Sequence, residues 1–120
     1  MQKLNKLIGK GATHLRESAA LSSILEKQKA SRKLYGAVCA SPAVVLAPQG
    51  LLDESAPATC YPAPNFREQL KIVSDNPVVV SDNVITSQGP GTSLLFALSL
   101  GEQLFGKEKR DEIAQQMLVK

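Results

Sequence analysis

The sequence has few of the residues that build disulfide-rich or metal-binding domains. Among 120 residues there are two cysteines, one histidine and no tryptophan, and aromatic residues make up 4%. Cys39 and Cys60 form no CxxC pair and no secretory segment precedes them, which argues against a disulfide scaffold or a zinc site. We therefore expect no metal and a reducing compartment. The cytoplasm fits best, with the nucleus or plastid import as alternatives.

Long apolar runs are also missing. The longest are Ala43–Ala47 and Leu94–Leu98, far below the roughly 20 residues that cross a bilayer. We expect no membrane partner. With 43% hydrophobic and 21% charged residues, a chain of this length is sized for one small globular domain.

The net charge of +3 is unevenly distributed. Residues 1–33 hold eight of the 14 basic side chains and only two of the 11 acidic ones. Basic segments can bind phosphates, but no aromatic residues alternate with these bases, which favours the solvated face of a helix. We expect no nucleic-acid partner.

Local patterns in the first half predict helix, strand and helix. Ser18 is a suitable N-cap for a helix that continues to Arg32 with apolar residues at helical spacing. The wholly apolar run Leu34–Val38 suits a strand buried on both faces of a parallel sheet. After it, Ser41 can cap a short buried helix that begins at Pro42.

The second half predicts a loop, a hairpin and further helices. Residues 51–64 are rich in proline and turn residues, whereas residues 65–70 suit one or two helical turns. Two valine-rich and isoleucine-rich runs flank Ser81–Asn83, which indicates a β-hairpin. Thr92 caps a long helix that ends at Gly106, and a last helix over residues 108–117 points Ile113 and Met117 inward.

The most distinctive local feature is a cysteine between the predicted strand and the short helix. The neighbours of Cys39 in residues 36–41 are small or apolar, as a pinched strand-to-helix turn that presents a nucleophile requires. A helix N-terminus would favour the thiolate. A buried, inert cysteine is the alternative.

Three segments resemble the DJ-1/PfpI family, in its parkinsonism-associated deglycase branch: residues 36–47, residues 58–62 and residues 84–98. Residues 11–15 and 102–108 are most similar to plant members. The resemblance covers residues 11–120. It implies a flavodoxin-like, three-layer α/β sandwich of the class I glutamine amidotransferase type, with a C-terminal hairpin and helices. It also implies a homodimer that needs no cofactor, with glyoxalase or deglycase activity on reactive carbonyls and a role in oxidative stress.

The resemblance also implies roles for individual residues. Cys39 corresponds to the nucleophile, and the backbone N–H of Ala40 to an oxyanion donor. Tyr61 stands where many relatives have a histidine, which puts general-base catalysis in doubt because a phenol has a pKa near 10. Cys60 reads as an ordinary loop residue, and the single His14 as structural or exposed.

Residues 1–10 do not resemble the family, so residues 11–120 correspond to the C-terminal portion of its domain. Relatives place two βα units before this portion, including a glutamate that shares a proton with the cysteine. We therefore expect an incomplete parallel sheet, and weak or absent turnover of a small aldehyde substrate. The alternative function is a non-enzymatic, redox-sensing or dimerising protein, or one that binds an N-terminal partner domain.

Overall fold

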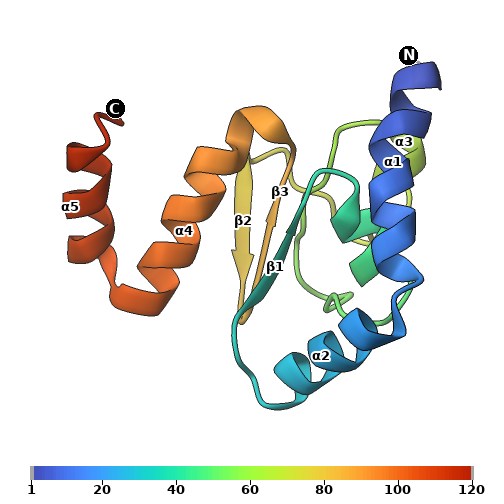
Figure 1. Cartoon of the computed structure of the whole chain (residues 1–120), viewed down its shortest axis with the longest axis horizontal. Helices are drawn as coiled ribbons and strands as arrows, with labels where there is room; N and C mark the ends of the chain where they lie inside the picture. Colours follow the sequence, from blue (N-terminus) through green and yellow to red (C-terminus); the bar gives the residue numbers. More distant parts are fainter. Residues whose placement is uncertain (1, 120) are drawn as a thin grey trace.

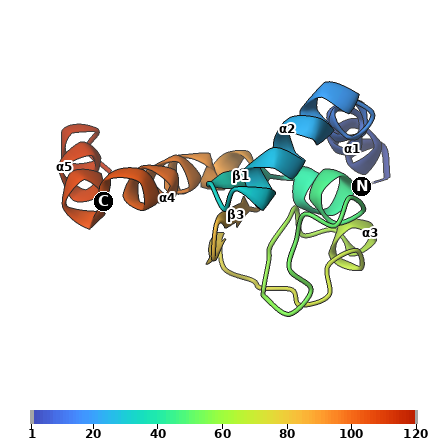
Figure 2. The same ribbon diagram turned by 90° about the horizontal axis from the view of Figure 1, so that it is seen from below.

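A three-stranded mixed sheet lies at the centre of the computed structural model, which describes the backbone of residues 2–119 and the side chains of residues 9–119. The strands lie in the order β1 (Tyr35–Val38), β3 (Val84–Ser87), β2 (Val78–Ser81), with β1 parallel and β2 antiparallel to β3. Figures 1 and 2 show helices on both faces of the sheet. The chain thus has the flavodoxin-like, layered α/β arrangement that its sequence predicts.

Helices α1 and α2 lie on one side of the sheet together with the short helix η1, and α4 and α5 lie on the other (Figures 1 and 2). No helix in the described part of the chain is long and apolar enough to span a bilayer. The bounds of the helices are α1 Gln2–Arg16, α2 Ala19–Ala30, η1 Pro42–Leu46, α3 Pro64–Arg67, η2 Pro90–Thr92, α4 Ser93–Phe105 and α5 Lys107–Gln116.

The first helices agree only partly with the expectation. Ser18 caps α2 as predicted, because its hydroxyl accepts the Leu21 N–H at 3.2 Å. The apolar side of α2 is less well covered than its spacing implies, and Ile24 is 61% exposed. Helix α1 runs without a break across the proposed boundary between residues 10 and 11. That boundary stays a prediction.

Strand β1 forms where expected, but one of its residues is not buried. Tyr35 is buried, whereas Gly36 is exposed and the next two residues are half-buried. The prediction of burial on both faces is therefore wrong for Gly36. The reason is that β1 lies at the edge of the sheet, with a strand on one side only among residues 2–119.

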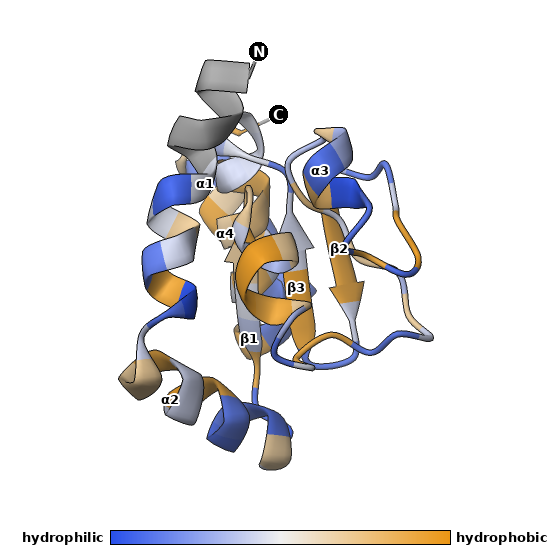
Figure 3. Cartoon of the chain, turned by 90° about the vertical axis from the view of Figure 1, so that its right-hand side faces the viewer, coloured by the Kyte–Doolittle hydropathy of each residue, from blue (hydrophilic) through white to orange (hydrophobic). Residues whose placement is uncertain are grey.

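The helix after β1 is short and buried as predicted, but its type and its cap differ. Residues Pro42–Leu46 form a π-helical turn, in which the Ala47 N–H donates to the Pro42 carbonyl at 3.0 Å. Ser41 has helical backbone angles and its hydroxyl makes no capping hydrogen bond. In Figure 3 this turn is coloured as strongly hydrophobic, which is consistent with its position in the core.

The predicted hairpin is present. Asp82 adopts a left-handed conformation with φ of 54°, as a tight two-residue turn between β2 and β3 requires. Helix α4 follows and ends at Gly106, whose φ of 92° suits glycine. Ile113 in α5 is half-buried, but Met117 is 51% exposed, so Met117 is no inward anchor.

Two groups of buried side chains hold these elements together. One surrounds η1 and includes Ala40, Cys60 and Phe66. The other joins the sheet to the following loop through Tyr35 and Leu51, and the Tyr35 hydroxyl also donates a hydrogen bond to the Leu51 carbonyl. Buried side chains therefore hold the chain both before and after Cys39, at Tyr35 and at Ala40.

Candidate functional site

Cys39 lies at the carboxyl end of β1 in a conformation that is rare for a residue with a side chain. Its φ is 66°, in the left-handed region. Two backbone hydrogen bonds hold it there: its N–H donates to the Ser87 carbonyl at 3.1 Å, and its carbonyl accepts the Tyr61 N–H at 2.7 Å. Such strain, of about 1–3 kcal/mol, persists only where the surroundings impose it, and it is concentrated at functional sites. The sequence indicated the turn through its small residues, but not the backbone strain.

The thiol of Cys39 is half-buried, and this burial raises its pKa. The backbone N–H of Ala40 donates a hydrogen bond to the sulfur, which acts in the opposite direction and favours the thiolate. We expected the following helix to favour the thiolate and so to lower the pKa of Cys39. That expectation is wrong for the net shift of the pKa, which is upward, because desolvation outweighs the single N–H donor. Within residues 9–119, no acidic side chain contributes to the pKa of Cys39.

The segment after the long loop brings Cys60 and Tyr61 against the turn at Cys39. Cys60 is 2% exposed, donates its thiol hydrogen to the Tyr61 carbonyl at 3.4 Å, and has its pKa raised by burial to about 11. Tyr61 is half-buried and packs edge-on against Phe66, with ring centroids 6.3 Å apart. The structure thus brings Cys39, Ala40 and Tyr61 together through backbone contacts.

Thr92 organises the loop that follows β3. Its hydroxyl lies 2.6 Å from the Ser87 hydroxyl and accepts the Gly89 N–H at 3.1 Å. Gly89 in turn approaches the Tyr61 ring, because a Cβ placed on it would lie 3.7 Å from Tyr61 Cδ2. Thr92 occupies the predicted N-cap position of α4, but it bonds this loop rather than the helix. Sequence reasoning missed this role, although the Ser and Thr flanking a Gly-Pro-Gly turn are its signal.

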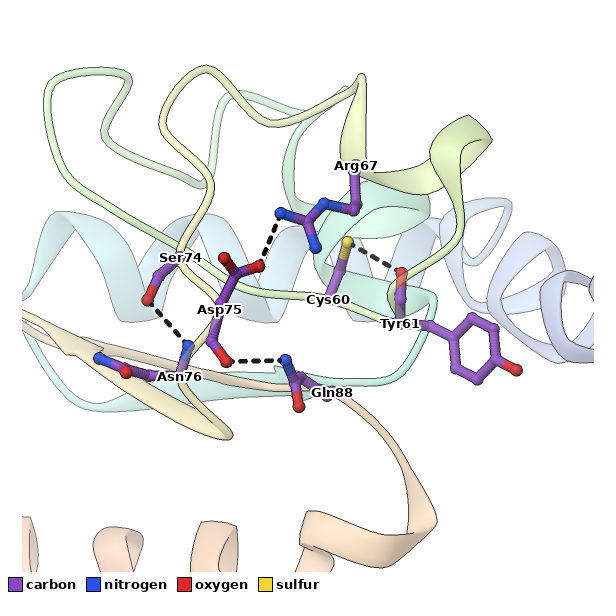
Figure 4. Close-up of polar contacts among 7 residues, drawn as sticks. All are labelled: Cys60, Tyr61, Arg67, Ser74, Asp75, Asn76 and Gln88. Carbon is purple, nitrogen blue, oxygen red and sulfur yellow. Dashed lines mark hydrogen bonds and ion pairs between the residues drawn. The ribbon is translucent and has the colours of Figure 1, made fainter.

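A second polar group connects the loop to α3. Arg67 and Asp75 form an ion pair at 2.8 Å, and the Gln88 side chain donates to the Asp75 carbonyl at 3.2 Å (Figure 4). Arg67 also lowers the pKa of Cys60 against the larger effect of burial. The Tyr61 ring points away from this group in Figure 4. No local pattern indicates this arrangement, because Asp75 is eight residues from Arg67 and 13 from Gln88 along the chain.

His14 does not belong to the site, since it is exposed near the end of α1. Among the described residues, no three His, Cys, Asp or Glu side chains are grouped as metal ligands. A cavity of about 340 Å³ opens near the start of β1, where Tyr35 and Leu51 line it. Cys39 is at the other end of that strand and does not line it.

Taken together, these features define a class: an α/β domain that presents a cysteine from a strained turn at the carboxyl end of a parallel strand. The family model of the DJ-1/PfpI family matches residues 8–103. The chain belongs to the DJ-1/PfpI family.

Individual relatives support this assignment. Protein DJ-1 homolog B of Arabidopsis thaliana is 43% identical over 109 residues, which are 91% of this chain and 25% of that protein. The glutathione-independent glyoxalase DJR-1.2 of Caenorhabditis elegans is 40% identical over 88% of this chain and 56% of that protein. The solved structure of oxidized Toxoplasma gondii DJ-1 superposes with a TM-score of 0.82 at 43% identity. The superposed part makes up 89% of this chain and 58% of the Toxoplasma gondii chain. The chain thus spans between a quarter and three-fifths of these relatives.

Proposed function

We propose that Cys39 is the nucleophile of a glyoxalase or deglycase type of reaction on small reactive carbonyl compounds. The observation that carries this proposal is the strained turn that places the Cys39 sulfur against the Ala40 N–H. The nematode glyoxalase among the relatives supports the substrate class. The proposal involves no metal or other cofactor.

In this reaction the Cys39 thiolate adds to the aldehyde carbon of an α-oxoaldehyde. A C–S bond forms while the carbonyl π electrons move to oxygen, where the Ala40 N–H stabilises the negative charge. Protonation gives a hemithioacetal. Transfer of a proton from this carbon to its neighbour oxidises the first carbon to a thioester and reduces the second to an alcohol. Water then releases a 2-hydroxy acid and the thiol.

The proton transfer is the step that this chain supports least. It needs a base, and Tyr61 is the proposed but weak candidate beside Cys39, because a phenol donates a proton more readily than it accepts one. A missing proton-transfer group lowers the rate by about 10²–10⁴-fold. We therefore propose weak turnover by the 120 residues alone. A complete site would need a carboxylate from a partner segment or from a second copy in a homodimer.

The test measures 2-hydroxy acid formation from methylglyoxal by the purified chain, with Cys39→Ala as the catalytic knockout and Cys60→Ala as the matched thiol control. Slow formation that Cys39→Ala abolishes and Cys60→Ala retains supports the proposal. Formation that survives Cys39→Ala refutes it.

A second candidate function, redox sensing, is favoured by one observation: the free thiol of Cys39 is only half-buried, whereas that of Cys60 is buried. Oxidation by a hydroperoxide needs only the thiolate and no proton-transfer base: the sulfur takes one peroxide oxygen to become a sulfenic acid, and the alcohol or water leaves. We propose this role for Cys39 if turnover is absent. Intact mass after peroxide treatment tests it, since Cys39→Ala should remove a gain of one oxygen and Cys60→Ala should not.

A further inference from the structure

Cys60 is a nucleophile that neither of the proposed reactions uses, and its backbone lies beside that of Cys39. These two residues are the only cysteines of the chain. The Tyr61 N–H donates to the Cys39 carbonyl at 2.7 Å, and backbone segments joined by such a bond run about 4.8 Å apart. Cys60 directly precedes Tyr61, which places its Cα close to that of Cys39. Disulfides join Cα atoms about 4.4–6.8 Å apart, so the fold already brings the two cysteines to a suitable separation.

The surroundings of the two thiols also connect them. Cys60 belongs to the same buried cluster as Ala40, the residue that follows Cys39. Negative charge on Cys39 raises the pKa of Cys60, as expected for two sulfur atoms that lie near each other. The hydrogen bond from the Cys60 thiol to the Tyr61 carbonyl is a weak one, at 3.4 Å. The Cys60 side chain can therefore turn toward Cys39 at small cost.

The two thiols differ in their access to solvent. Cys39 is half-buried, whereas Cys60 is 2% exposed. A peroxide in solution therefore reaches Cys39 first, and Cys60 reacts only with the oxidised form of Cys39. The Arg67 side chain beside Cys60 (Figure 4) favours its thiolate, although burial has the larger effect and raises the pKa of Cys60 to about 11. Well-oriented groups within one molecule reach effective concentrations of about 10⁵–10⁸ M, which offsets the small thiolate fraction.

We propose that Cys60 is the resolving cysteine of this chain: once a hydroperoxide has oxidised Cys39 to a sulfenic acid, Cys60 displaces the oxygen and forms an intramolecular disulfide. The inference rests on the redox role proposed above for Cys39. The Cys60 thiolate attacks the Cys39 sulfur, so that an S–S bond forms and the S–O bond breaks. The departing hydroxide takes up the proton that Cys60 released and becomes water. The hydroperoxide has then accepted two electrons, and an external dithiol restores both thiols.

The disulfide limits how far the oxidation of Cys39 proceeds. A sulfenic acid is reversible, whereas the sulfinic acid that a second peroxide produces is not recovered by thiols. Cys60 competes with that second peroxide for the same sulfur. In the wild-type chain the sulfenic acid is therefore short-lived and oxidation stops at the disulfide, whereas a chain without the Cys60 thiol proceeds to the sulfinic acid.

The test exposes the full 120-residue chain to hydrogen peroxide and follows intact mass and peptide maps over time. The wild-type chain should lose two hydrogens, with the Cys39 and Cys60 peptides linked, and dithiothreitol should restore both thiols. Cys60→Ser is the matched variant, because its hydroxyl can still donate to the Tyr61 carbonyl. It should gain one and then two oxygens at Cys39, and dithiothreitol should recover at least tenfold less Cys39 thiol than in the wild type.

Two outcomes separate this inference from the redox role on which it rests. Oxygen gained at Cys39 in both chains, with no disulfide in the wild type, overturns the role of Cys60 and leaves the redox role of Cys39 standing. No oxidation of Cys39 in either chain overturns both. A disulfide that joins two chains, seen as a dimer on a non-reducing gel, would assign the resolving thiol to a second copy and overturn the intramolecular step.

Dimedone supplies a measurement on the wild-type chain alone, in case Cys60→Ser disturbs folding. Dimedone reacts with sulfenic acids, so it should label Cys39 during peroxide treatment and reduce the yield of disulfide as its concentration rises. A yield that dimedone leaves unchanged, with no label on Cys39, overturns the sulfenic acid as the species that Cys60 attacks.

Discussion

Gly36 offers a sensitive test of the structure, because its backbone lies unusually close to its neighbours. A Cβ built on Gly36 would be 2.7 Å from the Ile85 backbone oxygen and 3.1 Å from Phe96 Cζ. The phenylalanine ring can move by a few tenths of an ångström. The Ile85 oxygen cannot move without disturbing the pairing of β1 with β3, which positions Cys39. Gly36→Ala should therefore destabilise the fold even though Gly36 is exposed.

The expected loss is about 1–3 kcal/mol, the usual range for overpacking, out of a total stability of about 5–15 kcal/mol for a small domain. At about 2 kcal/mol per molar urea, a loss of about 2 kcal/mol lowers the midpoint by about 1 M. Urea unfolding followed by circular dichroism measures this shift.

Gly101→Ala is the matched control for the same chemical change. Gly101 lies within α4, and a Cβ there would meet nothing within 4 Å. Alanine in a helix interior is favoured over glycine by about 0.5–1 kcal/mol, so the midpoint should rise by about 0.3–0.5 M. The reasoning is refuted if Gly101→Ala raises the midpoint as expected and Gly36→Ala leaves it unchanged or higher.

Three further predictions concern the site. Iodoacetamide at pH 8, followed by peptide mapping, should label Cys39 at least tenfold faster than Cys60, whose burial raises its pKa to about 11; preferential labelling of Cys60 would overturn the assignment of the reactive thiol. Burial raises the folded pKa of Cys60 from 9.0 to about 11, so the neutral thiol contributes stability of about 3 kcal/mol that is present below pH 9 and is lost as the pH rises through 11. Cys60→Ala should flatten that decline in urea midpoints, and an equally steep decline in the variant would contradict this cause. Thr92→Val leaves the Gly89 N–H without its acceptor and should destabilise the fold by about 1–3 kcal/mol, whereas unchanged stability would show that the loop does not depend on this hydroxyl.

Local chemistry in the sequence was enough to predict most of the elements. The Ser18 cap, the hairpin turn and the Gly106 end of α4 each depend on residues that are adjacent in the chain. Short-range rules also indicated Cys39, since a strand-to-helix turn with small neighbours is a local pattern. The family resemblance rests on equally local motifs, and the match over residues 8–103 confirms it.

Only the tertiary structure decided how these elements work together. The exposure of Gly36 depends on which strands flank β1, and the pKa of Cys39 depends on how much protein surrounds its sulfur. Thr92 bonds the loop after β3 instead of its helix because folding places the Ser87 hydroxyl beside it. Strand neighbours, desolvation and long-range hydrogen bonds arise from segments distant in sequence, and no local pattern of residues specifies them.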